Sequence, residues 1–408
     1  MAGPGGWRAE QAVSPDSPGS LRCRIRGVYA TFSLGPAVPN AHGESLTPVR
    51  TKGKRSAARV PGGAADASVD LTRLLDLVAA FPRHTIAVVG DFVLDGFVSG
   101  EIARVSREAP VLILRRRRIE SYLGGAANAV NNLVDLGARV FPVGIVGDDA
   151  EGRTLIESFR AKGVDVSRIL RVRGRTTPTK TRFLAGWSHT TEQQVLRVDH
   201  ESSEEIPAPT RESLARKARQ AARRADAVLV SDYGLGAATP DIVRGLRAKR
   251  ITLDSRYRML DYAGTGVCAA TPNESEIEDA YHQRVGTDTH KLEALGERAL
   301  DDLGLSCLVV TRGKDGMAVF ERAPADRREA PPPRHIPIYG SDTPVDVTGA
   351  GDTVIAVFTL ALAAGATCLE AAHLANYAGG IVVMKRRTAT VTRAELDAAL
   401  RREATAQR

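Results

Sequence analysis

The chain has 408 residues, of which 43% are hydrophobic and 25% charged, a composition typical of a globular enzyme with one large α/β domain or two smaller ones. The net charge of +8 does not indicate nucleic-acid binding, because residues 1–60 hold nine basic against three acidic residues and account for most of it. Four widely spaced cysteines without a Cys-x-x-Cys pair argue against a disulfide framework or a zinc site, and no apolar run is long enough to span a membrane.

Residues 1–68 are rich in Gly, Pro, Ser, Ala and Arg and show no sustained periodicity, which predicts a disordered, basic extension. An Arg-rich, acid-poor N-terminus also suits a targeting peptide, but the long apolar core of a secretory signal is missing. We therefore favour a plain extension on a cytoplasmic protein. From residue 71 to 81, leucines and a valine recur at helical spacing, so we expect a helix that packs on the body of the protein.

A short apolar strand is predicted over 85–90, and two acids, Asp91 and Asp95, follow it. Acids at the carboxyl end of a buried strand lie where open α/β sheets bind ligands. The alternative is that Asp91 is only a turn residue. A second strand, 111–114, precedes four consecutive arginines, 115–118, which we interpret as a solvated edge.

Strands and helices alternate through most of the chain, which predicts an α/β fold with a doubly wound, mostly parallel sheet flanked by helices. The segment Gly124-Gly-Ala-Ala-Asn128 opens one of these helices, and its small residues suit close approach of a polyhydroxylated ligand. Parts of about 96–120 and 178–200 are expected to form a small β-sheet that covers the site as a lid. The other predicted elements are helices 151–162, 210–224, 239–249, 367–384 and 393–402, and strands 140–146, 227–230, 251–254, 307–310 and 317–320.

The stretch Asp346-Val-Thr-Gly-Ala-Gly-Asp352 runs into an apolar helix that ends at Gly365 and is expected to be buried. Backbone N–H groups at a helix N-terminus have no intrahelical partner and lie at the positive end of the dipole, so they bind anions. Asp352 is placed to take a proton from an attacking hydroxyl while the amides hold a phosphoryl group. The plainer interpretation is a tight turn with Asp352 as a helix cap. A Rossmann site is disfavoured because Val354 replaces its third glycine, and no P-loop motif occurs.

This stretch resembles the C-terminal signature of the ribokinase-like (PfkB-type) carbohydrate kinases, and the resemblance extends over about residues 84–400. It implies a kinase domain over 69–403 that uses ATP and Mg²⁺, with Asp352 as general base and an anion hole made by the amides of Gly349, Ala350 and Gly351. Asn273-Glu-Ser-Glu276 matches the family's Asn-x-x-Glu motif, which helps to place Mg²⁺, through water, and the nucleotide phosphates. The residues expected to bind the nucleotide are Asn273, Glu276, Thr311, Gly313 and Asn376.

Within the family the sequence is most similar to the D-glycero-β-D-manno-heptose 7-phosphate kinases, which implies phosphorylation at C1. The segments that carry this likeness are 90–95, 104–111, 124–128, 179–182, 193–199, 231–233, 271–273 and 348–355. Leu235, Arg256 and Gly96-Phe97 depart from that pattern near the expected sugar-phosphate end, which bears on the exact substrate. Bifunctional relatives carry a nucleotidyltransferase after the kinase. Since the sequence has no His-x-Gly-His and ends at Arg408, we expect that second activity to be absent.

The resemblance also implies which residues hold the substrate. Lys180, Arg182 and Arg197 are candidates for a phosphate already on the sugar, the alternative being a salt-bridged lid strand. A monovalent cation such as K⁺ is implied at Asp346 and Thr348. The residues expected to hold sugar hydroxyls are Asp91, Asp95, Gly124, Gly125 and Asn128.

Two other functions stay open at this point. One is a kinase for fructose, ribose or a nucleoside, and the other is a non-catalytic sugar- or nucleotide-binding regulator on the same fold. In each case the partner is a small sugar or sugar phosphate, without nucleic acid or membrane, and a homodimer is left open.

Overall fold

The computed structural model describes residues 20–25, 28–33, 69–187, 192–202, 204–323 and 330–406. The chain divides into two units, Met1–Asp66 and Ala67–Arg408. In the first unit, strands β1 (Ser20–Ile25) and β2 (Val28–Ser33) pair antiparallel. The prediction of a disordered extension over 1–68 did not include this strand pair, and the rest of that prediction lies outside the described residues.

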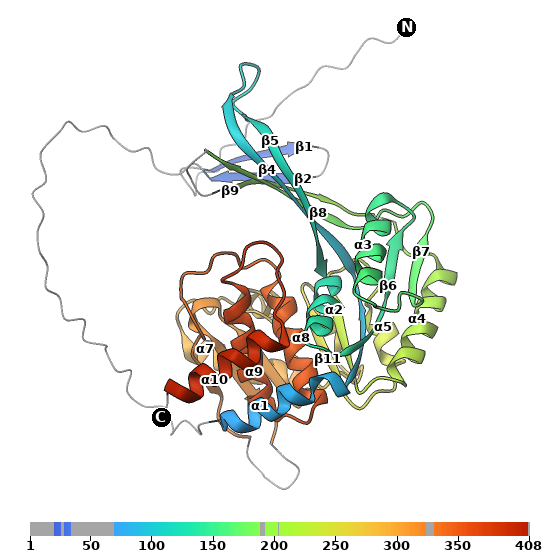
Figure 1. The fold of residues 1–408 in the computed structure, drawn as a ribbon, viewed down its shortest axis with the longest axis vertical. Coiled ribbons are helices and arrows are strands. Elements are labelled where there is room, and N and C mark those ends of the chain that lie inside the picture. The colour runs from blue at the N-terminus through green and yellow to red at the C-terminus, as the bar shows by residue number, and fades with distance from the viewer. Residues whose placement is uncertain are drawn as a thin grey trace, which may run out of the picture. The chain divides into compact units, whose positions relative to one another are not determined.

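The second unit is built on a nine-stranded sheet with the order β15-β14-β13-β12-β11-β10-β3-β6-β7 (Figure 1). Neighbouring strands from β7 to β13 are parallel, and β14 and β15 run antiparallel at one edge. Strands covered on both faces are continuous apolar runs, as in β3 and β10. The bounds are β3 (Thr85–Gly90), β6 (Arg139–Gly147), β7 (Ile169–Val172), β10 (Ala227–Asp232), β11 (Ile251–Ser255), β12 (Ala269–Ala270), β13 (Cys307–Thr311), β14 (Met317–Glu321) and β15 (Arg334–Ile336).

Helices cover both faces of this sheet, and each face has its own apolar cluster, which confirms the predicted doubly wound architecture. The first cluster includes side chains of α1 (Leu71–Ala80), α2 (Ala126–Asp135), α3 (Ala150–Ala161), α8 (Ala350–Ala363), α9 (Cys368–Val382) and α10 (Arg393–Ala406). The second includes side chains of α4 (Ala208–Ala222), α5 (Pro240–Arg244), α6 (Glu274–Tyr281) and α7 (Thr289–Asp302). Three short 3₁₀ helices are η1 (Phe81–Arg83), η2 (Met259–Tyr262) and η3 (Gly313–Asp315).

A separate four-stranded sheet stands apart from the nine-stranded one, as the alternation over 179–198 predicted (Figure 1). Its order is β5-β4-β8-β9, with β4 and β8 parallel in the middle and an antiparallel strand at each edge. Arg115–Arg118 are exposed on the edge strand β5, which confirms the interpretation as a solvated edge. The bounds are β4 (Phe92–Val105), β5 (Leu112–Gly125), β8 (Thr179–Gly186) and β9 (Gln193–His200).

The cysteines depart from the sequence prediction of thiols without a disulfide. Cys307, which opens β13, is bonded to Cys368, which opens α9, with the two Cα atoms 6.2 Å apart. The prediction is wrong for this pair because the two residues are 61 positions apart in the chain and only the tertiary fold brings them together. Cys268 is a free thiol. None of the helices in the described part of the chain is long and apolar enough to cross a membrane.

Candidate active site

The N-terminus of α8 is the centre of the site. Gly349 caps the helix in a left-handed conformation, with φ of 78°, and a Cβ atom there would lie 2.5 Å from the side-chain nitrogen of Asn128. The amide of Ala350 donates to the carbonyl of Val347 at 3.2 Å, so it is already engaged. The amides of Gly349 and Gly351 have no hydrogen-bond partner among the residues that the structure describes. The predicted anion hole of three amides is therefore reduced to these two in the protein as it stands.

Asp352 lies in the first turn of α8 and is 3% exposed. Its Oδ1 accepts a hydrogen bond from the Tyr233 hydroxyl at 2.7 Å, and its Oδ2 accepts one from Asn128 Nδ2 at 3.0 Å. Burial raises the pKa of Asp352 to about 7, although both hydrogen bonds oppose the shift. A carboxylate with such a pKa can take and release a proton near neutral pH. Gly349 occupies the cap position of α8, so Asp352 does not cap the helix, and its role as a general base stays a prediction.

Asn128, in α2, holds the carboxylate of Asp352 through a hydrogen bond. Its side-chain nitrogen also donates to the carbonyl of Gly349 at 3.2 Å, and its side-chain oxygen accepts from Asn132. The residue is fully buried and is absent from the lining of the neighbouring cavities. Asn128 therefore orients Asp352 and the turn before α8, and its contact with a sugar hydroxyl stays a prediction.

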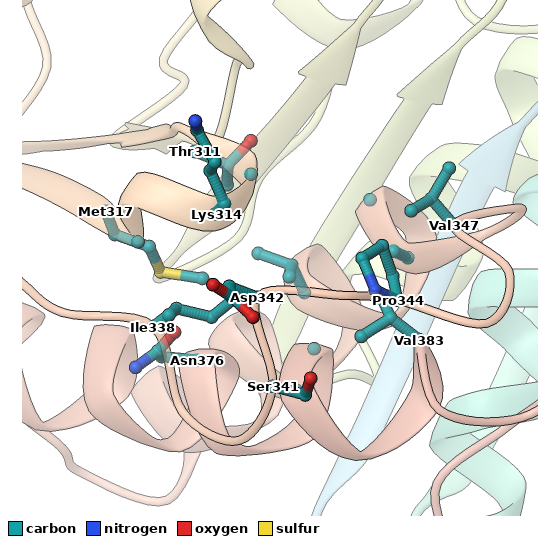
Figure 2. A pocket seen from close by; sticks show the side chains of 17 residues that line it. Thr311, Lys314, Met317, Ile338, Ser341, Asp342, Pro344, Val347, Asn376 and Val383 are labelled. Atoms are coloured by element: carbon teal, nitrogen blue, oxygen red, sulfur yellow. The ribbon is translucent and has the colours of Figure 1, made fainter. Parts of the chain in front are cut away.

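Two cavities meet at this helix end. One, of about 420 Å³ and called here the polar cavity, contains Asp352 and Glu276. The other, of about 350 Å³ and called the apolar cavity, includes Met317 and Ile338 (Figure 2). Both include Thr311, Gly313, Val347 and Gly351. A ligand spanning the two would pass directly over the free amides.

Most of the predicted site residues are brought together here, although they come from distant parts of the chain. Ala350 and Asn376 line the apolar cavity, and the Asn376 side chain donates to the carbonyl of Pro337 at 2.8 Å. The predicted residues that line the polar cavity are Asp95, Gly125, Lys180, Arg182, Arg197, Asn273, Glu276, Thr311, Gly313, Thr348, Gly349, Gly351 and Asp352.

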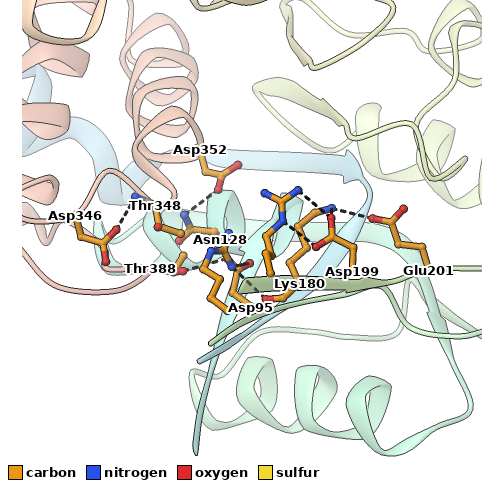
Figure 3. A network of polar contacts seen from close by, with 11 residues as sticks. Asp95, Asn128, Lys180, Asp199, Glu201, Asp346, Thr348, Asp352 and Thr388 are labelled. Carbon is orange, nitrogen blue, oxygen red and sulfur yellow. Dashed lines mark hydrogen bonds and ion pairs between the residues drawn. The ribbon is translucent and has the colours of Figure 1, made fainter. Parts of the chain in front are cut away.

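The four-stranded sheet β5-β4-β8-β9, called here the lid sheet, contributes Lys180, Arg182 and Arg197 to the lining of the polar cavity. Figure 3 shows the ion pairs around Lys180. Arg182 is paired with Asp95 at 2.7 Å, and Gly124 makes room for that carboxylate, because a Cβ at Gly124 would lie 2.5 Å from it. Lys180 is paired with Glu201 at 2.8 Å, and Arg197 with Asp199 at 2.9 Å. All three cations thus line the cavity and are paired with acids, as the alternative of a salt-bridged strand predicted, and their contact with a substrate phosphate stays a prediction.

Asp91 binds the backbone of the loop that follows β10. Its buried carboxylate accepts hydrogen bonds from the backbone amides of Tyr233, Leu235 and Ala237 at 2.7–3.0 Å. Burial raises its pKa to about 6. These contacts fix the loop that presents Tyr233 to Asp352, and the predicted contact of Asp91 with a sugar hydroxyl stays a prediction.

Residues 84–394 match the pfkB family carbohydrate kinase. The chain belongs to this family. Among curated relatives, the bifunctional protein HldE of Mesorhizobium japonicum is 40% identical over 330 residues, covering 79% of this chain and 63% of that protein. The HldE of Geobacter sulfurreducens is 38% identical and covers 76% of this chain and 61% of the relative. The chain therefore spans about three fifths of the length of these relatives.

Solved structures of other kinases share the fold. Arabidopsis thaliana ribokinase complexed with ribose and ATP superposes with a TM-score of 0.58 at 19% identity, covering 78% of this chain and 98% of that one. Phosphofructokinase-2 from Escherichia coli has a TM-score of 0.61 at 14% identity, covering 79% and 99%. At such identities the likeness shows the ribokinase-like fold alone.

Three polar residues that line the polar cavity were given no role in the site by the sequence analysis: Tyr233, Asp254 and Arg256. Each lies at or just beyond the carboxyl end of β10 or β11, neighbouring parallel strands. The signal that could have found them is this position, since open α/β sheets bind ligands at the carboxyl ends of their strands. Asp254 was read only as part of a strand end, without a role.

Acids gather on the side of the polar cavity nearest Asn273. Burial, with repulsion from Glu276 and Asp352, raises the pKa of Asp254 well above its usual range, and burial raises that of Glu276 as well. Asn273 and Glu276 also form a capping box at the start of α6. Among the described residues no three acids, histidines or cysteines are placed to chelate a metal directly. Carboxylates in need of a counter-charge fit Mg²⁺ held through water and substrate phosphates.

Proposed function

We propose that this chain transfers the γ-phosphoryl group of ATP to a hydroxyl of a sugar phosphate. The observation that carries the proposal is the position of Asp352: a buried base with a pKa near neutrality, beside free helix amides, where a polar and an apolar cavity meet. A non-catalytic binding protein would have no need of such a base. Support for the class of reaction comes from membership of the carbohydrate kinase family.

The chemistry follows from the geometry. Asp352 accepts the proton of the acceptor hydroxyl, whose oxygen bonds to the γ-phosphorus as the bond from that phosphorus to its bridging oxygen breaks and ADP leaves. Tyr233 and Asn128 hold the carboxylate in position. The amides of Gly349 and Gly351 stabilise the charge on the transferring group without reorganisation. Mg²⁺ would neutralise phosphate charge, and Glu276, Asn273 and Asp254 would hold it through water.

The apolar cavity suits the base of the nucleotide. Met317, Ile338 and Val383 offer apolar surface to a flat ring, and Lys314 and Asn376 supply polar groups at the rim (Figure 2). Thr311 and Gly313 belong to both cavities, so they are suited to the phosphates between base and acceptor. A monovalent cation near Asp346 and Thr348 is part of the proposal too. The Asp346 carboxylate already accepts the amide of Thr348 at 3.0 Å, which orders this turn.

For the acceptor we propose a heptose 7-phosphate, phosphorylated at C1. The likeness to heptose 7-phosphate kinases supports this choice, as does the presence of Lys180, Arg182 and Arg197 in the lining of the polar cavity. An arginine held by one acid still has free N–H groups for a phosphate.

The test is ADP formation with a panel of acceptors: heptose 7-phosphate, fructose 6-phosphate, ribose and nucleosides. We expect the highest kcat/KM for the heptose phosphate. A preference for another sugar would contradict the proposed substrate but would agree with the proposed kinase activity. Absence of ADP formation with every acceptor, together with measurable ATP binding by calorimetry, would favour the regulator.

Arg197→Ala tests the phosphate contact. Arg197 lies on β9 and is partly exposed, so its loss should leave the fold intact. We expect a higher KM for a phosphorylated sugar and a nearly unchanged KM for ATP. An equal change in the two KM values, or no change in either, would contradict a contact between Arg197 and the substrate phosphate.

A further inference from the structure

The segment between α9 and α10 contains an arginine in a conformation that arginine rarely adopts. Arg387 has φ of 68°, and only His282 shares a left-handed conformation among the described non-glycine residues. Its neighbour Arg386 is exposed and has no hydrogen bond or ion pair to the described residues, whereas the Arg387 side chain is 11% exposed. Such strain persists only where the surrounding contacts hold it in place.

The backbone of Arg387 is bound to the catalytic turn. Its amide donates to Oδ2 of Asp346 at 2.9 Å, while the other oxygen of the same carboxylate accepts the amide of Thr348 at 3.0 Å. Asp346 and Thr348 open the turn that leads to the free amides at the start of α8. The left-handed conformation of Arg387 therefore supports the turn that holds the phosphoryl group.

The side chain of Arg387 reaches the opposite way, into the lid sheet. Its guanidinium donates to Glu192 at 2.9 Å and to the Ser99 hydroxyl at 3.1 Å, and lies 3.4 Å from a Glu120 oxygen. These partners come from β4, β5 and the segment just before β9. The guanidinium also stacks on the ring of Phe97, with its carbon 5.0 Å from the ring centroid.

The segment that contains Arg387 makes a second contact with the lid sheet, through Thr388 and Asp95. Thr388 donates to Oδ2 of Asp95 at 3.0 Å, and the other oxygen of Asp95 pairs with Arg182 (Figure 3). Arg182 stacks on Phe97 at 5.3 Å, so this ring has an arginine from the lid and one from the body near it. A small cavity of about 210 Å³ lies among Phe97, Arg182, Asp346 and Arg387.

We propose that Arg387 is a positioning residue that couples the lid sheet to the phosphoryl-transfer turn. Through Asp346 it holds the turn, and through Glu192, Glu120 and Ser99 it holds the lid, so the lid and the amides of α8 come into place together. The proposal rests on the proposed function, because it assigns Arg387 a part in the same transfer. Removal of the guanidinium should loosen the lid, let water reach the phosphoryl group and raise the share of ATP that is hydrolysed without transfer.

Arg387→Gly separates the side chain from the backbone, since glycine accepts the left-handed conformation and keeps the amide bond to Asp346. We expect kcat for sugar phosphorylation to fall on the order of 10-fold to 10²-fold, because a catalytic group displaced by an ångström costs about that much. KM for the sugar should rise, the affinity for ATP should change less than about twofold, and Arg387→Lys should restore only part of the rate. Arg386→Ala is the matched control and should behave as the wild type.

Glu192→Gln removes one partner from the lid side and should lower kcat in the same direction. The double variant with Arg387→Gly should lose less than the sum of the two single effects, because the two residues share one interaction. Additive losses, or a kcat of Arg387→Gly within about twofold of the wild type, would overturn the proposal.

A measurement without substrate separates this proposal from the proposed function. Hydrogen exchange of β4 and β5 amides should be faster in Arg387→Gly and Glu192→Gln than in Arg386→Ala, while amides of β3 and β10 keep their protection. Unchanged exchange in the lid would overturn the coupling even if the chain proves to be an active kinase. Faster exchange in a chain that phosphorylates no sugar would agree with the coupling and contradict the proposed kinase activity.

Discussion

Asp352 combines three conditions that a general base needs. It is buried, which brings its pKa to about 7; it is held by Tyr233 and Asn128, which fixes its direction; and it stands beside the amides of Gly349 and Gly351. None of these conditions arises from Asp352 alone. Tyr233 and Asn128 come from segments far from Asp352 in the chain, so the reactivity of this side chain is a property of the folded site.

Asp352→Asn should lower kcat by ~10²–10⁴-fold, the usual contribution of a general base. The amide can still accept from Asn128 and donate to the Tyr233 hydroxyl, so the free energy of unfolding and the affinity for ATP should change little. Steady-state kinetics on the folded variant measure kcat, and nucleotide-binding calorimetry measures the affinity for ATP. A kcat near that of the wild type with the best substrate would show that the mechanism is wrong.

The pH dependence of the rate should report the same carboxyl group. Asp352 can accept a proton only when ionised, so kcat/KM should rise with pH and level off above about 7. The hydrogen bond from Tyr233 lowers the pKa of Asp352, so Tyr233→Phe should move the rise to higher pH. The control is Tyr257→Phe, which changes an exposed tyrosine and should leave the pH profile unchanged. A profile of Tyr233→Phe that does not move would separate the tyrosine from the base.

At the scale of elements, the turn before α8 uses its two glycines differently. Gly349 needs a left-handed backbone and has no space for a Cβ. Gly351 has neither constraint: its conformation is helical and no atom lies within 4 Å of a Cβ placed there. The structure therefore gives no conformational reason for a glycine at position 351.

The two glycine variants should therefore fail in different ways. Gly349→Ala should lower the free energy of unfolding by ~1–2 kcal/mol or more, because a left-handed alanine is strained and would contact Asn128. Gly351→Ala should keep or slightly raise stability, since alanine favours helix. Its methyl group points to where the two cavities meet, so ATP affinity and kcat should fall. Thermal unfolding and calorimetry distinguish the two; a loss of stability in Gly351→Ala with normal ATP binding would contradict this assignment.

For the whole molecule, the unit Ala67–Arg408 contains both apolar clusters and the entire candidate site. Its first helix, α1, is capped by Asp70 and buries Leu74, Leu77 and Val78. The helix α1 therefore belongs to the unit Ala67–Arg408, and the domain bounds of 69–403 stay a prediction.

A chain starting at Val69 should keep the melting temperature and kinase activity of the full chain. A chain starting at His84 should melt at a lower temperature, because it loses the buried face of α1. Differential scanning calorimetry and ADP formation measure both. Loss of folding in the chain that starts at Val69 would show that residues 1–68 contribute to the stability of the body.

The sequence by itself determined the fold class and the centre of the site. Apolar runs separated by amphipathic helices are enough to predict a parallel sheet, and the period-two alternation over 179–198 is enough to predict a lid strand pair, because both signals are local. The motif around Asp352 is local too: a glycine turn, a helix and an acid in its first turn, all within seven residues.

Only the tertiary structure decided which residues face the cavities. Asp91 and Asp95 look alike in the sequence, yet one carboxylate binds three backbone amides and the other lines the polar cavity. Arg387 carries no local signal, and Cys307 meets Cys368 only through the packing of β13 and α9. The physical reason is that burial, hydrogen-bond partners and electrostatic neighbours are set by segments far apart in the chain, whereas periodicity and turn chemistry are set by neighbours along it.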